Sequence, residues 1–155
     1  MELLAPAGSR QALTAAVQSG ADAVYLGGPQ FGARYSAENF TIEEMKTWVD
    51  YCHLYGVDVH VTVNTLVKEK EIESLKEYLK QLNKIGVQDM GAVEIIKKTV
   101  PDMTLHASTQ MTVTSLEGVK YLEDMGFSRV VLARELSEKE IEHICKNAKA
   151  EIEVF

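Results

Sequence analysis

The sequence predicts an α/β fold: an incomplete TIM-type (β/α)8 barrel with parallel strands and outer helices, forming a single partial domain over residues 1–155. Two observations support this prediction. Short apolar runs, often β-branched, break off repeatedly into glycine or polar residues, and a helix-like segment follows each of them. This alternation is typical of βαβ units around a parallel sheet. The chain is also much shorter than the about 250 residues usual for a closed eight-stranded barrel.

Strands are expected where the apolar runs lie, at residues 3–5, 23–26, 57–63, 104–107, 130–133 and 152–155. One strand is absent from this series, because only Val87 and Gln88 separate Gly86 from Asp89, where the repeat requires a strand. Either the chain has lost a piece there, or one unit turns with almost no strand. We therefore expect the fourth strand to be missing and the chain to end at the seventh.

Helix boundaries are marked by capping residues and by glycines. Thr41 with Glu44, and Ser137 with Glu140, have the spacing of a capping box, and Ser9 is a third candidate N-cap. The predicted helices cover residues 10–19, 45–54, 69–85, 91–99, 115–125 and 139–146. Four of them end at a glycine, which favours the left-handed conformation that closes a helix: Gly20, Gly56, Gly86 and Gly126.

Alternation along the third run predicts which way its side chains point. The valines at 57, 59, 61 and 63 share one face, and His60, Thr62 and Asn64 share the other. Helices cover the outside of a parallel barrel, so the valines should face helices and the polar set should face the interior. By the same alternation Glu2 and Glu153 should point inward, where a carboxylate needs a partner.

Polar side chains at the carboxyl ends of the strands are the candidate site, since ligands bind there in parallel α/β folds. The densest cluster is the segment 106–110, in which His106, Ser108 and Gln110 supply short donors and acceptors. His106 is able to act near neutral pH. The alternative is a histidine and hydroxyls bonded to neighbouring backbone at a turn.

Arginine and its neighbours give a second candidate feature. Only four of the sixteen basic residues are arginines, and two of these, Arg34 and Arg134, lie in segments that follow strands. A guanidinium fork in such a place suits a carboxylate or a phosphate. A structural ion pair of Arg134 with Glu135 is the alternative. The predicted substrate-binding set is Arg34, Asn64, His106, Ser108, Gln110, Arg134 and Glu135; catalytic residues stay unknown.

Composition limits the function classes. The formal net charge of −7 argues against a nucleic-acid footprint spread over the whole surface and leaves room for a local basic rim. The two cysteines, Cys52 and Cys145, lack a C-x-x-C spacing and are expected to be reduced thiols, with no metal site drawn on them. No apolar stretch reaches the about 20 residues that span a bilayer, and no signal segment opens the chain, so a cytoplasmic protein without membrane contact is expected.

Five segments of the chain carry a resemblance to a known family. They are ELLAPAG at 2–8, GADAVYLG at 20–27, SAENF at 36–40, HASTQM at 106–111 and VLAREL at 131–136. In this order they resemble the amino-terminal barrel of the peptidase U-32 family, the collagenase-like peptidases. The resemblance implies a TIM-type barrel and a historical assignment as a collagenase-like protease. It also implies relatives that hydroxylate tRNA or rRNA or assist ubiquinone hydroxylation, with an iron–sulfur cluster and, in some, prephenate as a required metabolite.

Two departures from the family pattern qualify the resemblance. Family members carry an apolar strand at the gap after Gly86, and they continue past Phe155 into cysteine-bearing segments that ligate the cluster. Neither Cys52 nor Cys145 matches those cysteines. The chain therefore looks like a fragment or a truncated relative that holds part of the pocket and no cofactor of its own.

Three functions follow as hypotheses. The first is an RNA hydroxylation-type enzyme when full length; the second is a collagenase-like peptidase, a hydrolase; the third is a non-catalytic scaffold half acting with a partner chain. The sequence has neither a protease nucleophile pattern nor an H-E-x-x-H motif, so we expect the isolated chain to be inactive as a protease and to bind no iron. RNA or peptide is the expected substrate of the full-length protein. A homo-oligomer or a partner chain is expected to cover the open barrel edges.

Overall fold

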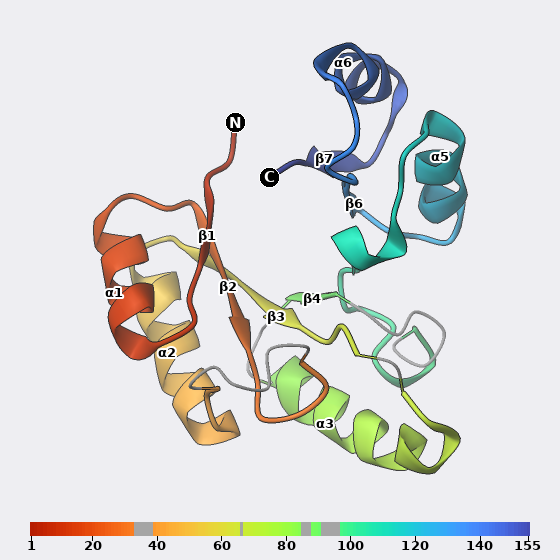
Figure 1. Cartoon of the computed structure of the whole chain (residues 1–155). Helices are drawn as coiled ribbons and strands as arrows, with labels where there is room; N and C mark the ends of the chain where they lie inside the picture. The colour runs from red at the N-terminus through yellow and green to blue at the C-terminus, as the bar shows by residue number, and fades with distance from the viewer. Residues whose placement is uncertain (33–38, 66, 85–87, 91–96) are drawn as a thin grey trace. The chain divides into compact units, whose positions relative to one another are not determined.

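The computed structural model describes residues 1–32, 39–65, 67–84, 88–90 and 97–155, and it shows two compact units, Met1–Met103 and Thr104–Phe155. Each unit contains its own parallel sheet with helices beside it (Figure 1). The α/β class with parallel strands and outer helices is therefore confirmed. The assignment of residues 1–155 to a single domain stays a prediction.

The first unit has a four-stranded parallel sheet in the order β1-β2-β3-β4, so each strand pairs with the next one along the chain. A helix follows each of the first three strands, as βαβ units require. The elements of the first unit are β1 Leu4–Pro6, α1 Arg10–Gln18, β2 Ala23–Gly27, α2 Ile42–Leu54, β3 Asp58–Thr62, the 3-10 helix η1 Glu69–Glu71, α3 Ile72–Lys84 and β4 Gln88–Met90.

The second unit repeats the same plan with three parallel strands in the order β5-β6-β7. Its elements are β5 His106–Ala107, the 3-10 helix η2 Thr109–Met111, α5 Leu116–Asp124, β6 Arg129–Val131, α6 Glu138–Asn147 and β7 Glu151–Glu153. Strand β7 is the seventh strand among the described residues, and it overlaps the last strand predicted from the sequence, at residues 152–155.

The expectation of a missing fourth strand is wrong. Residues Gln88–Met90 form β4, which pairs in parallel with β3 through the partners His60 with Gln88 and Thr62 with Met90. The expectation failed because it confined the strand to the two residues between Gly86 and Asp89, whereas β4 continues through Asp89 to Met90. Strand pairing uses backbone N–H and C=O groups, which polar residues carry equally well. Gly86, and residues 91–96 of the predicted helix 91–99, lie outside the described residues; residues 97–99 are helical.

The predicted helix caps are confirmed. The Ser9 side chain accepts a hydrogen bond from the Ala12 N–H, and Thr41 and Glu44 form the full capping box. At α6 the Glu140 carboxylate accepts from both the backbone N–H and the hydroxyl of Ser137. Three helices end before a glycine with positive φ, at Gly20, Gly56 and Gly126, so the short-range signals of the sequence set these boundaries.

Strand β3 is buried on both faces, as expected for a central strand of a parallel sheet. The four valines at 57, 59, 61 and 63 are at most 4% exposed, and α2 packs on this strand. His60, on the other face, is 2% exposed. The core of the unit continues into α3, where Leu75, Tyr78, Leu79 and Leu82 form a buried stripe. This packing holds the carboxyl ends of β2 and β3 in place.

The second unit has a smaller core around β6. Val130, Val131 and Leu132 are at most 1% exposed, and α5 and α6 contribute further buried side chains, Val119, Leu122 and Ile144. Helices α5 and α6 pack against each other. Among the described residues, no helix is both long and apolar enough to cross a membrane.

Candidate functional site

In the first unit, the carboxyl ends of β2 and β3 are joined by the segment that follows β2. The backbone N–H of Asn64, just after β3, donates to the Phe31 carbonyl oxygen at 3.0 Å. The Thr62 hydroxyl donates to the Leu26 carbonyl oxygen at 3.3 Å. Asn64, a predicted site residue, is half-buried and lies at this edge of the sheet, as the sequence indicates.

A close approach between Gly28 and helix α3 shapes the same edge. A Cβ atom at Gly28 would overlap the Tyr78 hydroxyl and would lie 3.1 Å from Tyr78 Cζ and 3.4 Å from the Met45 sulfur. Only glycine fits there. At Gly27 a Cβ would meet the Asn39 side-chain oxygen at 2.9 Å, so Asn39 also lies at this edge. Sequence reasoning did not single out Tyr78 or Asn39 as site residues.

In the second unit, two segments that follow neighbouring strands are tied together. Ser108 is the N-cap of η2, and its hydroxyl accepts from the Gln110 N–H at 3.4 Å. The chain then returns to the sheet, where Val113 pairs with Leu132 and its carbonyl oxygen accepts from the Ala133 N–H at 3.0 Å. The segment that contains Ser108 and Gln110 therefore leads directly to the end of β6, next to Arg134.

Arg134 and Glu135 are both exposed beyond the end of β6. The Arg134 guanidinium carbon lies 5.3 Å above the centre of the Phe155 ring, a cation–π arrangement that orients the side chain. Ser108 is half-buried and Gln110 is exposed, so this part of the unit presents hydroxyl, amide and guanidinium donors to solvent. Such a set suits an anionic or carbonyl-bearing ligand.

His106 lies elsewhere in the unit. It is 3% exposed in β5, and its partner in the sheet register is Arg129, the first residue of β6. Arg134 comes five residues later along the same strand direction. His106 therefore lies within the sheet, and Arg134 lies beyond its carboxyl end. Asn64 belongs to the other unit, and its convergence with either residue stays a prediction. Arg34 lies outside the described residues.

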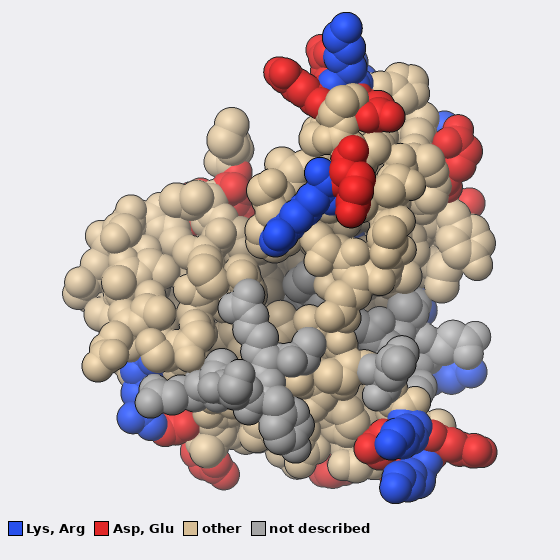
Figure 2. All heavy atoms as spheres, in the orientation of Figure 1, with Lys and Arg blue, Asp and Glu red and all other residues tan. Residues whose placement is uncertain are grey.

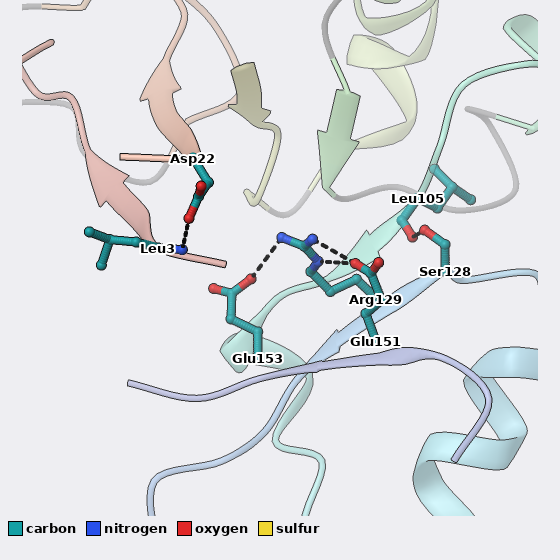
Figure 3. Close-up of polar contacts among 7 residues, drawn as sticks. All are labelled: Leu3, Asp22, Leu105, Ser128, Arg129, Glu151 and Glu153. Atoms are coloured by element: carbon teal, nitrogen blue, oxygen red, sulfur yellow. Dashed lines mark hydrogen bonds and ion pairs between the residues drawn. The ribbon is translucent and has the colours of Figure 1, made fainter. Parts of the chain in front are cut away.

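Arg129 is the polar residue that the sequence argument missed. Its side chain is 10% exposed, and two of its nitrogens donate to one carboxylate oxygen of Glu151 at 2.9 and 2.6 Å (Figure 3). A third nitrogen lies 3.9 Å from Glu153, whose side chain is 13% exposed. The inward orientation predicted for Glu153 thus comes with a cation partner. Glu2, in contrast, is exposed, so the inward orientation predicted for it stays a prediction.

A signal for Arg129 was present in the sequence. Glu151 and Glu153 alternate with an apolar residue in the last strand, and an arginine begins the preceding one. In a parallel pair of strands, residues in register point to the same face, so Arg129 shares a face with its partner Glu151 and with Glu153, two residues further along β7. Assigning register from sequence would have been necessary to use this signal.

The cysteines do not fit an iron–sulfur cluster, which usually needs four thiolate ligands. Cys52 is buried in α2, and this burial raises the pKa of its thiol to about 11. Cys145 is exposed in α6, in the other unit. No group of three or more His, Cys, Asp or Glu side chains that could hold a metal ion occurs in the part of the chain that the structure describes.

Charges on the surface are mixed. On the face drawn in Figure 2, lysine and arginine side chains lie beside aspartate and glutamate side chains, and no continuous basic patch covers the described residues of that face. Ion pairs along the helices, such as Lys76 with Glu73 at 2.7 Å and Lys146 with Glu142 at 2.6 Å, account for part of this mixing. The surface agrees with the net charge of −7.

These features define the class of protein as a parallel α/β protein with its polar groups on the segments that follow the strands. The model of Peptidase family U32 matches residues 8–155, so the chain belongs to this family. The chain is 39% identical to the tRNA hydroxylation protein P1 of Bacillus subtilis over 99% of its length. It is 40% identical to the 23S rRNA 5-hydroxycytidine C2501 synthase of Escherichia coli over its whole length.

The match covers only part of each relative: 38% of the Bacillus subtilis protein and 24% of the Escherichia coli protein. Among solved structures, the U32 peptidase Mk0906 superposes with a TM-score of 0.79 at 17% identity, over 99% of this chain and 68% of that one. At this identity the likeness concerns the fold. The family resemblance of the five sequence segments is confirmed.

Proposed function

We propose that this chain forms part of an enzyme that hydroxylates RNA, either tRNA or rRNA. The observation that carries the proposal is the identity of 39% and 40%, along essentially the whole chain, to two relatives named for tRNA and rRNA hydroxylation. Such an enzyme works where tRNA and ribosomes are, so we also propose a cytoplasmic location. In this proposal the chain contributes substrate-binding groups, and the redox cofactor is held outside it.

The geometry supports a binding role for particular residues. Asn64 stands at the carboxyl edge of the first sheet, and Ser108, Gln110 and Arg134 follow β5 and β6 in the second unit. Arg134 offers a guanidinium fork to a carboxylate or a phosphate. Prephenate, which the family resemblance implies, carries carboxylates of this kind. His106 is buried, so its proposed part is to support the site from the sheet rather than to contact solvent-borne substrate.

A chimera tests the proposal. This chain would replace the matching region of the Bacillus subtilis tRNA hydroxylation protein P1, and the chimera would be expressed in a strain that lacks that protein. Mass spectrometry of digested tRNA should then detect nucleosides with one additional oxygen. A parallel chimera in the Escherichia coli rRNA synthase, assayed on 23S rRNA, separates the two RNA classes.

The matched variants are Arg134→Ala and Lys139→Ala in each chimera. Lys139 is an exposed lysine on α6, outside the predicted site, so its removal should leave hydroxylation unchanged. Arg134→Ala should reduce hydroxylation at least tenfold, because loss of a charge-assisted bond costs about 1.5–3 kcal/mol. Correctly folded chimeras that hydroxylate neither RNA would contradict the proposal.

A peptidase is the second candidate, and the names of the family and of the solved structure Mk0906 favour it. Gelatin cleavage by purified protein that contains no cluster would support this candidate. We expect none from the 155-residue chain. Cleavage abolished by a single substitution in this chain would establish the peptidase instead.

Finally, we propose that the two sheets belong to a TIM-type barrel that this chain leaves incomplete, and that a second copy or a partner chain pairs with its open strand edges. A purely structural half that works with such a partner is the third candidate. Light scattering at micromolar concentration measures the assembly. A mass of 17.2 kDa that does not change with concentration would contradict pairing with a second copy of the chain.

A further inference from the structure

Phe31 has an unusual backbone. Its φ is 58°, in the left-handed region that a bulky residue rarely adopts, and it lies four residues after the end of β2. A residue in this region persists only where its surroundings impose it, and such residues cluster at functional sites. The contacts around Phe31 therefore bear on function.

Three contacts hold the segment that contains Phe31. Its carbonyl oxygen accepts the Asn64 N–H at 3.0 Å, which fixes it to the carboxyl end of β3. Its ring lies 5.8 Å from the Tyr78 ring, centre to centre, with an interplanar angle of 45°. The Ser74 hydroxyl of α3 donates to the side-chain oxygen of Gln30 at 3.5 Å, the limit of a hydrogen bond. The segment is thus tied to β3 and to α3 together.

The two rings differ in exposure. Tyr78 is 3% exposed and packs over Gly28, whereas Phe31, at the edge of the sheet, is only partly buried. The buried Tyr78 ring thus contacts a Phe31 ring that remains partly accessible to solvent. This surface lies where parallel α/β folds bind their ligands.

We propose that Phe31 is a stacking platform for a nucleobase of the RNA substrate and that Tyr78 is the positioning residue that holds it. This inference rests on the proposed RNA hydroxylation. Enzymes that modify a base take it out of the stack and read it between aromatic or apolar side chains. The chain carries a net charge of −7, and acidic and basic side chains are mixed on the face drawn in Figure 2, so we assign the contact with the base to stacking, which needs no cation.

The test uses the chimera with the Bacillus subtilis protein and compares four variants in a tRNA hydroxylation assay. Phe31→Leu keeps an apolar side chain and removes the ring, and Phe31→Tyr keeps the ring. Tyr78→Leu removes the support. Phe40→Leu is the matched control, because Phe40 is a buried phenylalanine of the same unit at 3% exposure.

Phe31→Leu and Tyr78→Leu should raise KM for tRNA about tenfold with kcat within a factor of two, in line with the stacking strength of a base on an aromatic ring. Phe31→Tyr should keep the KM of the unsubstituted chimera, and Phe40→Leu should change thermal stability without changing KM. An unchanged KM for Phe31→Leu in an active chimera would overturn the stacking platform and leave RNA hydroxylation standing.

If neither unsubstituted chimera hydroxylates RNA, the proposed function fails. Whether Phe31 stacks on a nucleobase is then tested separately, by nucleoside binding. Uridine and cytidine would be titrated into the 155-residue chain and followed by NMR. The expected result is ring-current shifts at the Phe31 ring and the Asn64 amide, with no shift on addition of ribose. Absence of these shifts in a folded chain would overturn the inference.

Discussion

The two units build their sheets from the same strand–helix alternation, but different buried polar side chains lie in their strands. In the first unit, Tyr25 and His60 are register partners within a sheet whose other face is lined by valines. In the second unit one register row consists of His106, Arg129 and Glu151. Both sheets have an apolar core, and the second also carries ion pairs between the largely buried Arg129 and the acids Glu151, which is mostly exposed, and Glu153.

This difference locates the polar chemistry of each unit. Around the first sheet, Asn39 and Asn64 lie on the segments that follow the strands, and His60 is buried within β3. In the second sheet a largely buried arginine, Arg129, lies within a strand and is paired with acids of the neighbouring strand. We therefore expect the first unit to be sensitive to the loss of apolar packing and the second to be sensitive also to the loss of the Arg129 ion pairs.

The largest effect should come from Arg129→Leu. This change leaves the enclosed Glu153 carboxylate without the cation 3.9 Å away and removes both bonds to Glu151. We expect a loss of about 3–5 kcal/mol in the free energy of unfolding, as when one partner of a buried pair is removed. Urea unfolding followed by circular dichroism measures it.

Glu151→Gln is the matched control for Arg129→Leu. The Glu151 side chain is 67% exposed, so its removal should cost less than about 1 kcal/mol. Equal losses for the two variants would mean that enclosure of the charge plays no part in the stability of the second sheet.

A cavity created by substitution in the core of the first unit would test its apolar packing. Leu79 in α3 is fully buried, and Leu79→Ala should cost about 2–5 kcal/mol. Trp48 is the single tryptophan and lies in the first unit, so its fluorescence reports that unit alone. If residues 1–155 are one cooperative domain, the fluorescence and circular dichroism transitions of this variant should coincide. Separate transitions would show two independently folding units.

Gly28→Ala should have a smaller effect, about 1–3 kcal/mol, because the added methyl group overlaps the Tyr78 hydroxyl. Thermal unfolding of the Gly28→Ala variant measures the cost of the clash. Thermal unfolding of the double variant Gly28→Ala with Tyr78→Phe measures how much of that cost is relieved. The double variant should recover part of the loss, since the Tyr78 ring carbon at 3.1 Å remains. Gly8→Ala, which meets nothing within 4 Å, should be nearly neutral. A neutral Gly28→Ala would contradict the close packing at this edge.

The smallest effect concerns pH in the second unit. The pKa of the Glu123 carboxyl lies below its usual value, first because the Ala150 N–H bonds it and then because the Lys149 N–H does. The stability from these bonds is therefore present above the unfolded-state pKa of about 4.3 and is lost as the pH falls through the lower folded-state pKa.

Glu123→Gln should flatten this acid dependence, and Asp124→Asn, on the exposed neighbour, should preserve it. The urea midpoint measured between pH 7 and pH 3 gives the comparison. A Glu123→Gln profile identical to that of the unsubstituted chain would show that the link between α5 and the segment before β7 does not depend on charge.

Much of the local structure could be predicted because its causes are short-range. The caps at Ser9, Thr41 and Ser137 and the glycine at the end of α1 are satisfied within a few residues of chain. The alternation of valines in β3 likewise follows from the two-residue period of a strand. The segments that carry Asn64, Ser108 and Arg134 were predicted on the same basis, from the order of strands and loops.

What the sequence by itself determined is thus the alternation of strands and helices, the helix ends, the family and the polar segments after the strands. The tertiary structure decided the existence of β4, the pairing of His106 with Arg129, and the left-handed backbone of Phe31 held by Asn64 and Tyr78. These three depend on strand register and on contacts between residues far apart in the chain. Short-range patterns do not encode such contacts, because register is chosen only when the strands pack together.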